Sequence, residues 1–255
     1  MTITDTHTHL YSTQFDDDRH EMMQRALDNG VSRFFIPAID SSYTKAMLNL
    51  EKEFSEYIFL MMGLHPTSVN ENYEEELSLV KEWLDKRKFY AVGEIGIDLY
   101  WDKSLLQQQQ DAFKKQIAWA KEKDLPIVIH CRDAFDEIFE VLDGAKDDKL
   151  HGIFHCFTGT LDQAKRAIDF DMKLGIGGVV TFKNGGIDKF LNEISLEHIV
   201  LETDSPYLAP TPYRGKRNES SYIINVLDKL VDIYNLTPQE IAEITTQNSR
   251  KVFGI

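Results

Sequence analysis

The chain contains 255 residues, of which 42% are hydrophobic, 27% are charged and only 7 are proline. This composition excludes a disordered or collagen-like protein and is typical of a globular one. The 42 acidic residues outnumber the 28 basic ones and give a formal net charge of -14 at pH 7, so the overall charge opposes binding to nucleic acid and anionic membranes, and a polyanionic substrate would have to be attracted locally.

The start of the chain and its cysteines predict a cytoplasmic protein with no membrane partner. The longest apolar run, 57–64, is much shorter than the roughly 20 residues that span a bilayer, and the first residues lack the basic segment of a secretory signal. Cys131 and Cys156 cannot form a disulfide framework and lack CxxC spacing. Each follows a histidine, so on a strand each thiol would point away from that histidine, and we interpret both as structural. No pattern indicates an obligate protein partner.

Eight short apolar segments alternate with longer amphipathic segments, and no proline-, serine- or glycine-rich linker separates them. This alternation is typical of parallel sheets, and eight units fit a closed barrel better than an open doubly wound sheet, whose glycine-rich phosphate motifs are absent. We therefore expect an α/β fold, a single (β/α)8 TIM barrel domain over residues 1–255. The predicted strands are 3–9, 33–39, 58–64, 90–97, 126–131, 152–157, 173–177 and 199–204, and the clearest predicted helices are 19–29, 107–123, 221–234 and 238–252.

Polar residues gather where the predicted strands end. The C-terminal ends of the strands form one face of such a barrel, and ligands bind there, so these side chains are expected to lie together. His7 and His9 are two residues apart, which lets both rings leave the same side of a strand and hold one cation. Each group alone has an ordinary explanation as a hydrogen-bonded histidine or a salt-bridged carboxylate, but their recurrence favours a metal site. The residues are His7, His9, His65, Glu94, His130, His155, Glu202 and Asp204.

Four imidazoles and two carboxylates of this set are more than one tetrahedral ion needs. They suit two ions that share a carboxylate and keep open positions for water. The mixture of nitrogen and oxygen donors favours Zn, Mn or Fe over a site for Mg alone. Three further histidines, His20, His151 and His198, fall in a predicted helix or before predicted strands, and we expect them to be structural or surface residues.

A basic and aromatic segment, 206–218, follows Asp204 in this otherwise acidic chain. Arg214, Lys216 and Arg217 are candidates for contacts with phosphate, and Tyr207 or Tyr213 is a candidate for stacking on a base. Three basic residues in a loop are also a common form of surface charge, so the sequence leaves both interpretations open.

Seven short motifs carry a resemblance that runs nearly from end to end: DTHTHL at 5–10, GLHP at 63–66, GEIGID at 93–98, HCR at 130–132, HCF at 155–157, ETDSPY at 202–207 and RGK at 214–216. In order and spacing they resemble the TatD-related metal-dependent DNases, a branch of the amidohydrolase-like barrels. The chain departs from that pattern at Ser220 and Ser221, where the family usually has proline after the motif RGKxNE. We expect the two hydroxyls to cap the next helix.

The resemblance implies two divalent metal ions of Mg, Mn or Zn on either side of a bridging carboxylate. It implies that one ion binds His7, His9, Glu94 and Asp204, that Glu94 bridges to the second, and that His130 and His155 complete the second site. It also suggests that His65 and Arg132 line the phosphate pocket, with Asp98 and Tyr100 as supporting residues nearby.

The expected reaction is phosphodiester hydrolysis by metal-activated water, with Asp204 orienting that water and accepting its proton while Glu94 joins the ions. Because the rest of the chain is acidic, we expect few phosphate contacts and a shallow salt dependence. This suits a deoxyribonuclease that acts 3′ to 5′ on single-stranded DNA ends. Two alternatives stay open: hydrolysis of an ester or amide, such as an aminoacyl-tRNA ester, and a non-catalytic metal-binding or scaffold protein, against which the complete ligand set argues.

Overall fold

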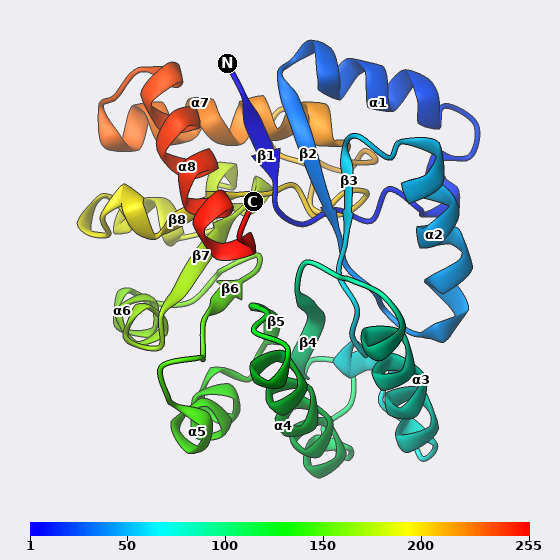
Figure 1. Ribbon diagram of the computed structural model, residues 1–255. Coiled ribbons are helices and arrows are strands. Elements are labelled where there is room, and N and C mark those ends of the chain that lie inside the picture. The colour runs from blue at the N-terminus through cyan, green and yellow to red at the C-terminus, as the bar shows by residue number, and fades with distance from the viewer.

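The computed structural model describes residues 1–255 as a ring of eight parallel strands enclosed by eight α-helices (Figure 1). This arrangement confirms the predicted (β/α)8 barrel. Most strand residues are buried, which is why the strands read mainly as short hydrophobic runs. They are β1 (Ile3–Asp5), β2 (Val31–Ile36), β3 (Ile58–Leu60), β4 (Val92–Asp98), β5 (Ile127–Arg132), β6 (Gly152–Phe154), β7 (Met172–Ile176) and β8 (Ile199–Leu201).

Backbone hydrogen bonds close the ring. β1 to β3 form one parallel group and β4 to β8 another, with neighbours in chain order. The first seam joins β3 to β4 through Met62, which donates to Ala91 O at 3.2 Å and accepts from Gly93 N at 3.0 Å. The second joins β1 to β8, where Thr6 N donates to Leu201 O at 3.0 Å. Because both seams are paired, the C-terminal ends of all eight strands surround a single opening.

The helices begin and end at residues with clear local signals. Thr160 with Gln163, and Thr237 with Glu240, form capping boxes at the starts of α6 and α8. Gly30 follows α1 with a φ of 86°, a conformation that glycine adopts without strain. The four clearest helix predictions are confirmed to within two residues. The helices are α1 (Arg19–Asp28), α2 (Thr44–Glu53), α3 (Tyr73–Lys86), α4 (Leu106–Glu122), α5 (Phe135–Ala145), α6 (Leu161–Asp169), α7 (Ile223–Tyr234) and α8 (Pro238–Phe253).

Two local predictions were wrong. Several strands end earlier than expected, so that His7, His9, His155 and Asp204 lie just beyond β1, β6 and β8 rather than on them. The chain turns there, with Asp204 at a φ of 56°, a left-handed conformation that aspartate tolerates better than most residues.

Neither serine of the 220–221 pair caps α7. Ser220 Oγ instead donates to Asp5 Oδ2 at 2.6 Å, and Ser221 Oγ donates to Glu219 Oε1 at 2.5 Å. The short 3-10 turn Ser220–Tyr222 precedes α7, whose start has no side-chain cap. The Ser220 hydroxyl, at the position where the resemblance predicts proline, therefore joins a buried polar network at Asp5, the last residue of β1.

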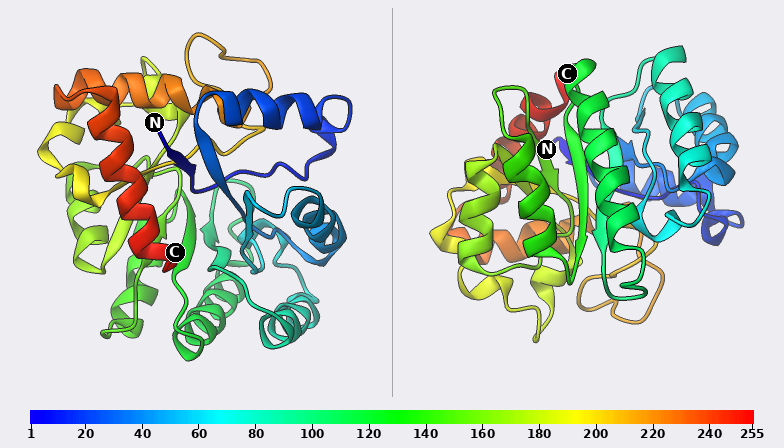
Figure 2. Two further views of the ribbon diagram at one scale, coloured as in Figure 1. Left: turned by 45° about the horizontal axis from the view of Figure 1, so that its top comes forward. Right: turned by 90° about the horizontal axis from the view of Figure 1, so that it is seen from below.

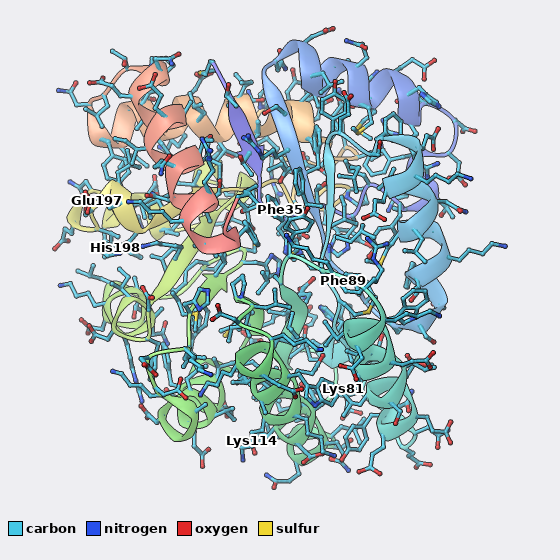
Figure 3. All side chains as sticks on the ribbon, in the orientation of Figure 1. Phe35, Lys81, Phe89, Lys114, Glu197 and His198 are labelled. Carbon is cyan, nitrogen blue, oxygen red and sulfur yellow. The ribbon has the colours of Figure 1, made fainter.

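One end of the barrel is filled with apolar side chains. Phe35, Val128 and Val200 are fully buried there with the C-terminal residues of α8, and the rings of Phe35 and Phe253 stack with centroids 3.6 Å apart. Figure 3 places Phe35 near the centre of the ring of strands, beside the last turn of α8. This plug closes the N-terminal end of the barrel and leaves the polar cluster to the other end.

The long connection between β8 and α7 lies on the opposite side of the barrel from the C-terminus (Figure 2). It carries the basic segment 206–218 and therefore borders the face where the strands end. None of the helices combines the length and the hydropathy that a membrane crossing requires.

Candidate metal centre

Glu94 lies at the centre of the polar cluster, and its two carboxylate oxygens face different sets of histidines. Oε2 is 3.1 Å from His7 Nε2 and 3.7 Å from His9 Nε2. Oε1 is 2.8 Å from His130 Nδ1 and 2.9 Å from His155 Nε2. The carboxylate comes from β4, whose seven residues are all buried, so its position is fixed by the barrel wall. A carboxylate placed in this way can bridge two cations.

Asp204 completes the set on the Oε2 side. Its Oδ1 is 3.4 Å from His9 Nε2 and 3.8 Å from His7 Nε2. The backbone holds this residue against the start of the chain, because Asp204 N donates to His7 O at 2.9 Å. The structure thus brings together all six side chains that the sequence singled out as metal-ligand candidates. Candidate ligand atoms within 4.8 Å of one another occur in three sets: His7, His155 and Asp204; His7, His9 and Glu94; and His65, Glu94 and His130.

Burial and neighbouring charges shift the pKa values of the clustered side chains in opposite directions. Burial disfavours the charged Glu94 carboxylate, but the imidazoles around it, those of His155, His65 and His7 foremost, hold its pKa well below the usual range. Burial lowers the pKa of His7 and of His65. The pKa of His155 is raised well above its ordinary value, because the carboxylates of Glu94 and Glu202 outweigh the effect of burial. Divalent cations bind an ionised carboxylate and neutral imidazoles, so His7 and His65 are in the form that a cation needs, whereas His155 would release a proton when an ion binds.

Unpaired ring nitrogens show that the cluster fits a metal ion. The side chain of His7 is fully buried, yet neither of its ring nitrogens forms a hydrogen bond. His155 Nδ1 is also buried without one. Buried polar atoms are nearly always hydrogen-bonded, so imidazole lone pairs left free beside carboxylates indicate a place for a cation.

Polar side chains that are not themselves candidate ligands contact several of the histidines and orient their rings. His130 Nε2 lies 2.9 Å from Asp98 Oδ2, and His9 Nδ1 lies 2.8 Å from the Tyr11 hydroxyl. Glu202, fully buried, accepts from Cys156 N at 2.6 Å and lies 3.5 Å from His155 Nδ1. Such partners fix the ring orientation and the tautomer of metal-binding histidines.

The barrel wall makes room for Glu202 at a glycine. A Cβ on Gly175 of the neighbouring strand β7 would stand 2.2 Å from Glu202 Oε2, so a side chain at this position would displace the Glu202 carboxylate.

Two residues of the site had no role assigned from the sequence. The sequence analysis placed Glu202 in the cluster without a role, and it did not identify Tyr11. Its position two residues after His9 was the only signal that could have indicated it.

His65 lies closer to the cluster centre than the resemblance suggested. Its Nε2 is 3.1 Å from Glu94 Oε1 and 3.3 Å from His130 Nδ1, while Thr67 Oγ1 lies 2.7 Å from its Nδ1. The expected phosphate-pocket residue is therefore also placed to share a cation on the Oε1 side.

The predicted substrate-binding residues lie around the opening, in different settings. The guanidinium of Arg132, at the end of β5, lies over the ring of Tyr100 at 3.7 Å. The ring of Tyr207, which is 53% exposed, is 5.9 Å from that of His9. Arg214 packs over Phe182 at 3.5 Å, and Lys216 is exposed. Only Tyr207 and Arg132 of these residues contact groups next to the metal cluster.

The three histidines expected to be structural lie outside the cluster. His20 pairs with Glu53 at 2.6 Å on the outer helices, and His151 Nδ1 bonds to Lys149 O at 2.9 Å. His198 lies before β8, at the edge of the barrel seen in Figure 3.

Both cysteine thiols are half-buried and poorly placed to ionise. Burial raises the pKa of Cys131 to about 12 and that of Cys156 well above its ordinary value. Cys156 lies beyond β6 with a φ of 43°, so the strand alternation expected for it does not apply. Their environment agrees with thiols that have a structural role.

Arg217 anchors the 206–218 loop rather than projecting towards the opening. Its guanidinium forms a bidentate pair with Asp18, at 2.6 and 2.8 Å, at the start of α1. Arg25 of α1 makes a second bidentate pair with Glu219, at 2.8 and 2.7 Å. Two arginine–carboxylate pairs therefore fix the end of the loop to α1.

The Arg217 pair predicts a pH-dependent loss of stability. Replacing Arg217 with glutamine is expected to lower the free energy of unfolding at pH 7 by about 1 kcal/mol. Hydrogen bonding to Arg217 holds the pKa of Asp18 below its usual range. The stabilisation is therefore complete above the unfolded carboxyl pKa, near about 4, and is lost as the pH falls below it. Urea unfolding of both proteins at pH 7 and at lower pH measures this, with exposed Lys183→Gln as control. A difference that stayed constant down to pH 2.5 would contradict the assignment.

The barrel and its histidine–carboxylate cluster are typical of a metal-dependent hydrolase. Residues 4–254 match the family of TatD related DNases. The chain belongs to this family.

Known proteins similar to the chain along its whole length agree with this assignment. It is 39% identical over 253 residues to a metal-dependent hydrolase of Bacillus subtilis, YabD, with 98% of each chain covered. It is 30% identical to the 3′-5′ ssDNA/RNA exonuclease TatD of Pantoea ananatis, over 98% of this chain and 99% of that one. The crystal structure of YjjV, a TatD homolog from Escherichia coli K12, has a TM-score of 0.93 and 28% identity, and covers 99% of this chain and 98% of its own. The protein is thus a metal-dependent hydrolase that acts on ester bonds.

Proposed function

We propose that this protein hydrolyses phosphodiester bonds at the 3′ ends of single-stranded DNA, using two divalent cations, and that residues 1–255 act as one catalytic domain. The observation that carries the proposal is the division of the histidines between the two oxygens of Glu94. The Pantoea relative, named a 3′-5′ ssDNA/RNA exonuclease, supports the direction and the substrate.

The chain provides two adjoining sets of ligands. His7, His9 and Asp204 with Glu94 Oε2 would hold one ion, and His130 and His155 with Glu94 Oε1 would hold the other. His65 borders the second set. When bound, two divalent ions lower the pKa of a water and stabilise the entering and leaving oxygens of a phosphoryl group.

Asp204 is the candidate to orient the attacking water and accept its proton. Its side chain is 13% exposed, whereas that of Glu94 is 3% exposed, so Asp204 is the carboxylate that water reaches more readily. Burial would raise its pKa, but a hydrogen bond from His9 and the nearby imidazoles lower it, so the group is ionised at neutral pH. Because the Asp204 carboxylate is ionised and reached by water, we assign it the role of general base.

Local charge explains how an acidic protein can take an anionic substrate. Two divalent ions would add four positive charges against the two negative charges of Glu94 and Asp204. The guanidinium of Arg132, which lies over the Tyr100 ring at the rim, adds one more positive charge. Since so few groups contact phosphate, the affinity is expected to depend weakly on salt.

Digestion of a 5′-labelled single-stranded oligonucleotide tests the proposal. Purified protein is incubated with Mn²⁺ or Mg²⁺, with a chelator control and with a duplex of the same sequence. The expected result is a ladder that shortens from the 3′ end and disappears with the chelator. Internal cuts would contradict the exonuclease direction. An intact oligonucleotide under every metal would contradict nuclease function and favour the ester or amide alternative, including aminoacyl-tRNA.

A further inference from the structure

The exposed aromatic side chains of this protein are confined to one end of the barrel. Six large hydrophobic residues are exposed, and four of them are aromatic: Tyr43, Tyr100, Trp101 and Tyr207. All four lie on loops that follow strands, after β2, β4 and β8. These are the loops that surround the metal centre. An exposed tryptophan or tyrosine costs free energy in water, and a group of them beside a site indicates a ligand with an apolar face.

Trp101, the most exposed of the four, packs against other side chains in the loop after β4. Trp101 is 72% exposed, and its ring meets that of Tyr100 edge to face, with centroids 4.9 Å apart and an interplanar angle of 89°. The Arg132 guanidinium lies 3.7 Å from the Tyr100 ring and 5.5 Å from the Trp101 ring. We call these three residues the aromatic platform. Its arginine has no carboxylate partner, so its charge is free to meet an anion.

The aromatic platform is connected directly to the metal centre. Asp98 accepts a hydrogen bond from Tyr100 N through Oδ1 at 3.0 Å, and its Oδ2 lies 2.9 Å from His130 Nε2. Leu99 N donates to Arg132 O at 2.9 Å, which fixes the β4 loop to the end of β5. The platform therefore stands beside the histidines on the Glu94 Oε1 side, at the opposite side of the cluster from Tyr207, which stands beside His9.

We propose that the aromatic platform is a nucleobase subsite, in which Trp101 stacks on a base next to the scissile phosphate while Arg132 contacts the adjoining phosphate. This inference rests on the proposed nuclease function and assigns a new role to Trp101. Every base has a flat π-face, so stacking on Trp101 is independent of sequence, and it requires a base that is free of a duplex. The subsite therefore explains a preference for single strands.

The test separates base recognition from hydrolysis. Trp101→Ala, Trp101→Phe and Leu79→Ala are compared with the wild-type protein, because Leu79 is an exposed residue of α3 outside the loops that surround the metal centre. Each protein is assayed on a single-stranded oligonucleotide and on the same oligonucleotide with abasic residues at its last two 3′ positions. Binding is measured separately, by fluorescence anisotropy with a labelled oligonucleotide whose 3′ linkages are slowly cleaved phosphorothioates.

Trp101→Ala is expected to raise KM and Kd for the normal oligonucleotide about tenfold and to leave kcat within about twofold. Trp101→Phe should recover most of the loss, and Leu79→Ala should match the wild type. On the abasic oligonucleotide, Trp101→Ala and wild type should have the same KM. Unchanged KM and Kd in Trp101→Ala, or an equal loss on both substrates, would overturn the subsite while leaving the nuclease function intact. Absence of cleavage and binding by the wild-type protein would instead overturn the proposed function and the subsite with it.

Discussion

Replacing Glu94 with glutamine is expected to lower kcat/KM for phosphodiester hydrolysis by at least about a thousandfold, or roughly 4 kcal/mol of transition-state stabilisation. The substitution keeps the shape of the side chain but removes the negative charge that faces both sets of histidines, at 3.1 Å on one side and 2.8 Å on the other. It also replaces one of the two carboxylate oxygens with an amide NH2 group, whose nitrogen cannot bind a cation. Both ions should therefore bind more weakly.

Metal content distinguishes this explanation from misfolding. Elemental analysis of Glu94→Gln should find fewer ions per chain than in the wild type, and circular dichroism should find the same secondary structure. Glu53→Gln, which removes a surface carboxylate paired with His20 on the outer helices, is a matched control and should retain full activity. Activity within tenfold of wild type in Glu94→Gln would contradict the central position assigned to this residue.

Adding Mn²⁺ to metal-free protein is expected to raise Tm by at least about 10 °C. An ion present at about a hundred times its Kd adds about 2.7 kcal/mol of stability, and two ions add about twice that. For a domain of this size, 1 kcal/mol corresponds to about 2–4 °C. The physical reason lies in His7 Nε2, a buried ring nitrogen that lies beside Glu94 and Asp204 and forms no hydrogen bond. This unpaired nitrogen destabilises the metal-free fold, and a bound cation would pair with it.

Differential scanning calorimetry of chelated and Mn²⁺-loaded protein measures this shift. Glu94→Gln provides the control, because its shift should fall to less than half of the wild-type value. Equal shifts in the two proteins would mean that the ion binds elsewhere on this acidic chain. No shift in the wild type would contradict a metal centre in the cluster.

The fold and the composition of the cluster could be predicted from the sequence because both follow from simple periodicities. Eight apolar runs separated by amphipathic segments define a parallel barrel, and the polar residues at the ends of those runs must then meet at one face. The sequence predicts His7, His9, Glu94 and Asp204 as members of the cluster on this ground alone. The plug of Phe35 against Phe253 and the seam from Thr6 to Leu201 join residues far apart in the chain, and no local pattern predicts them.

The predictions that failed depended on backbone turns and on long-range partners. The strands were predicted to run through His155 and Asp204 because hydrophobicity marks burial rather than hydrogen bonding, and the chain turns before both residues. Ser220 looked like a helix cap, yet Asp5, 215 positions away in sequence, accepts its hydrogen bond. For Arg217 the sequence left open both a phosphate contact and surface charge, and Asp18, which precedes α1, holds it. Only the folded chain brings such partners together.

Anomalous diffraction from crystals grown with Mn²⁺ would show whether Glu94 separates two metal sites. Two anomalous peaks are expected, one beside Glu94 Oε2 with His7 and His9, the other beside Glu94 Oε1 with His130 and His155. A single peak, or peaks away from the Glu94 carboxylate, would contradict this separation.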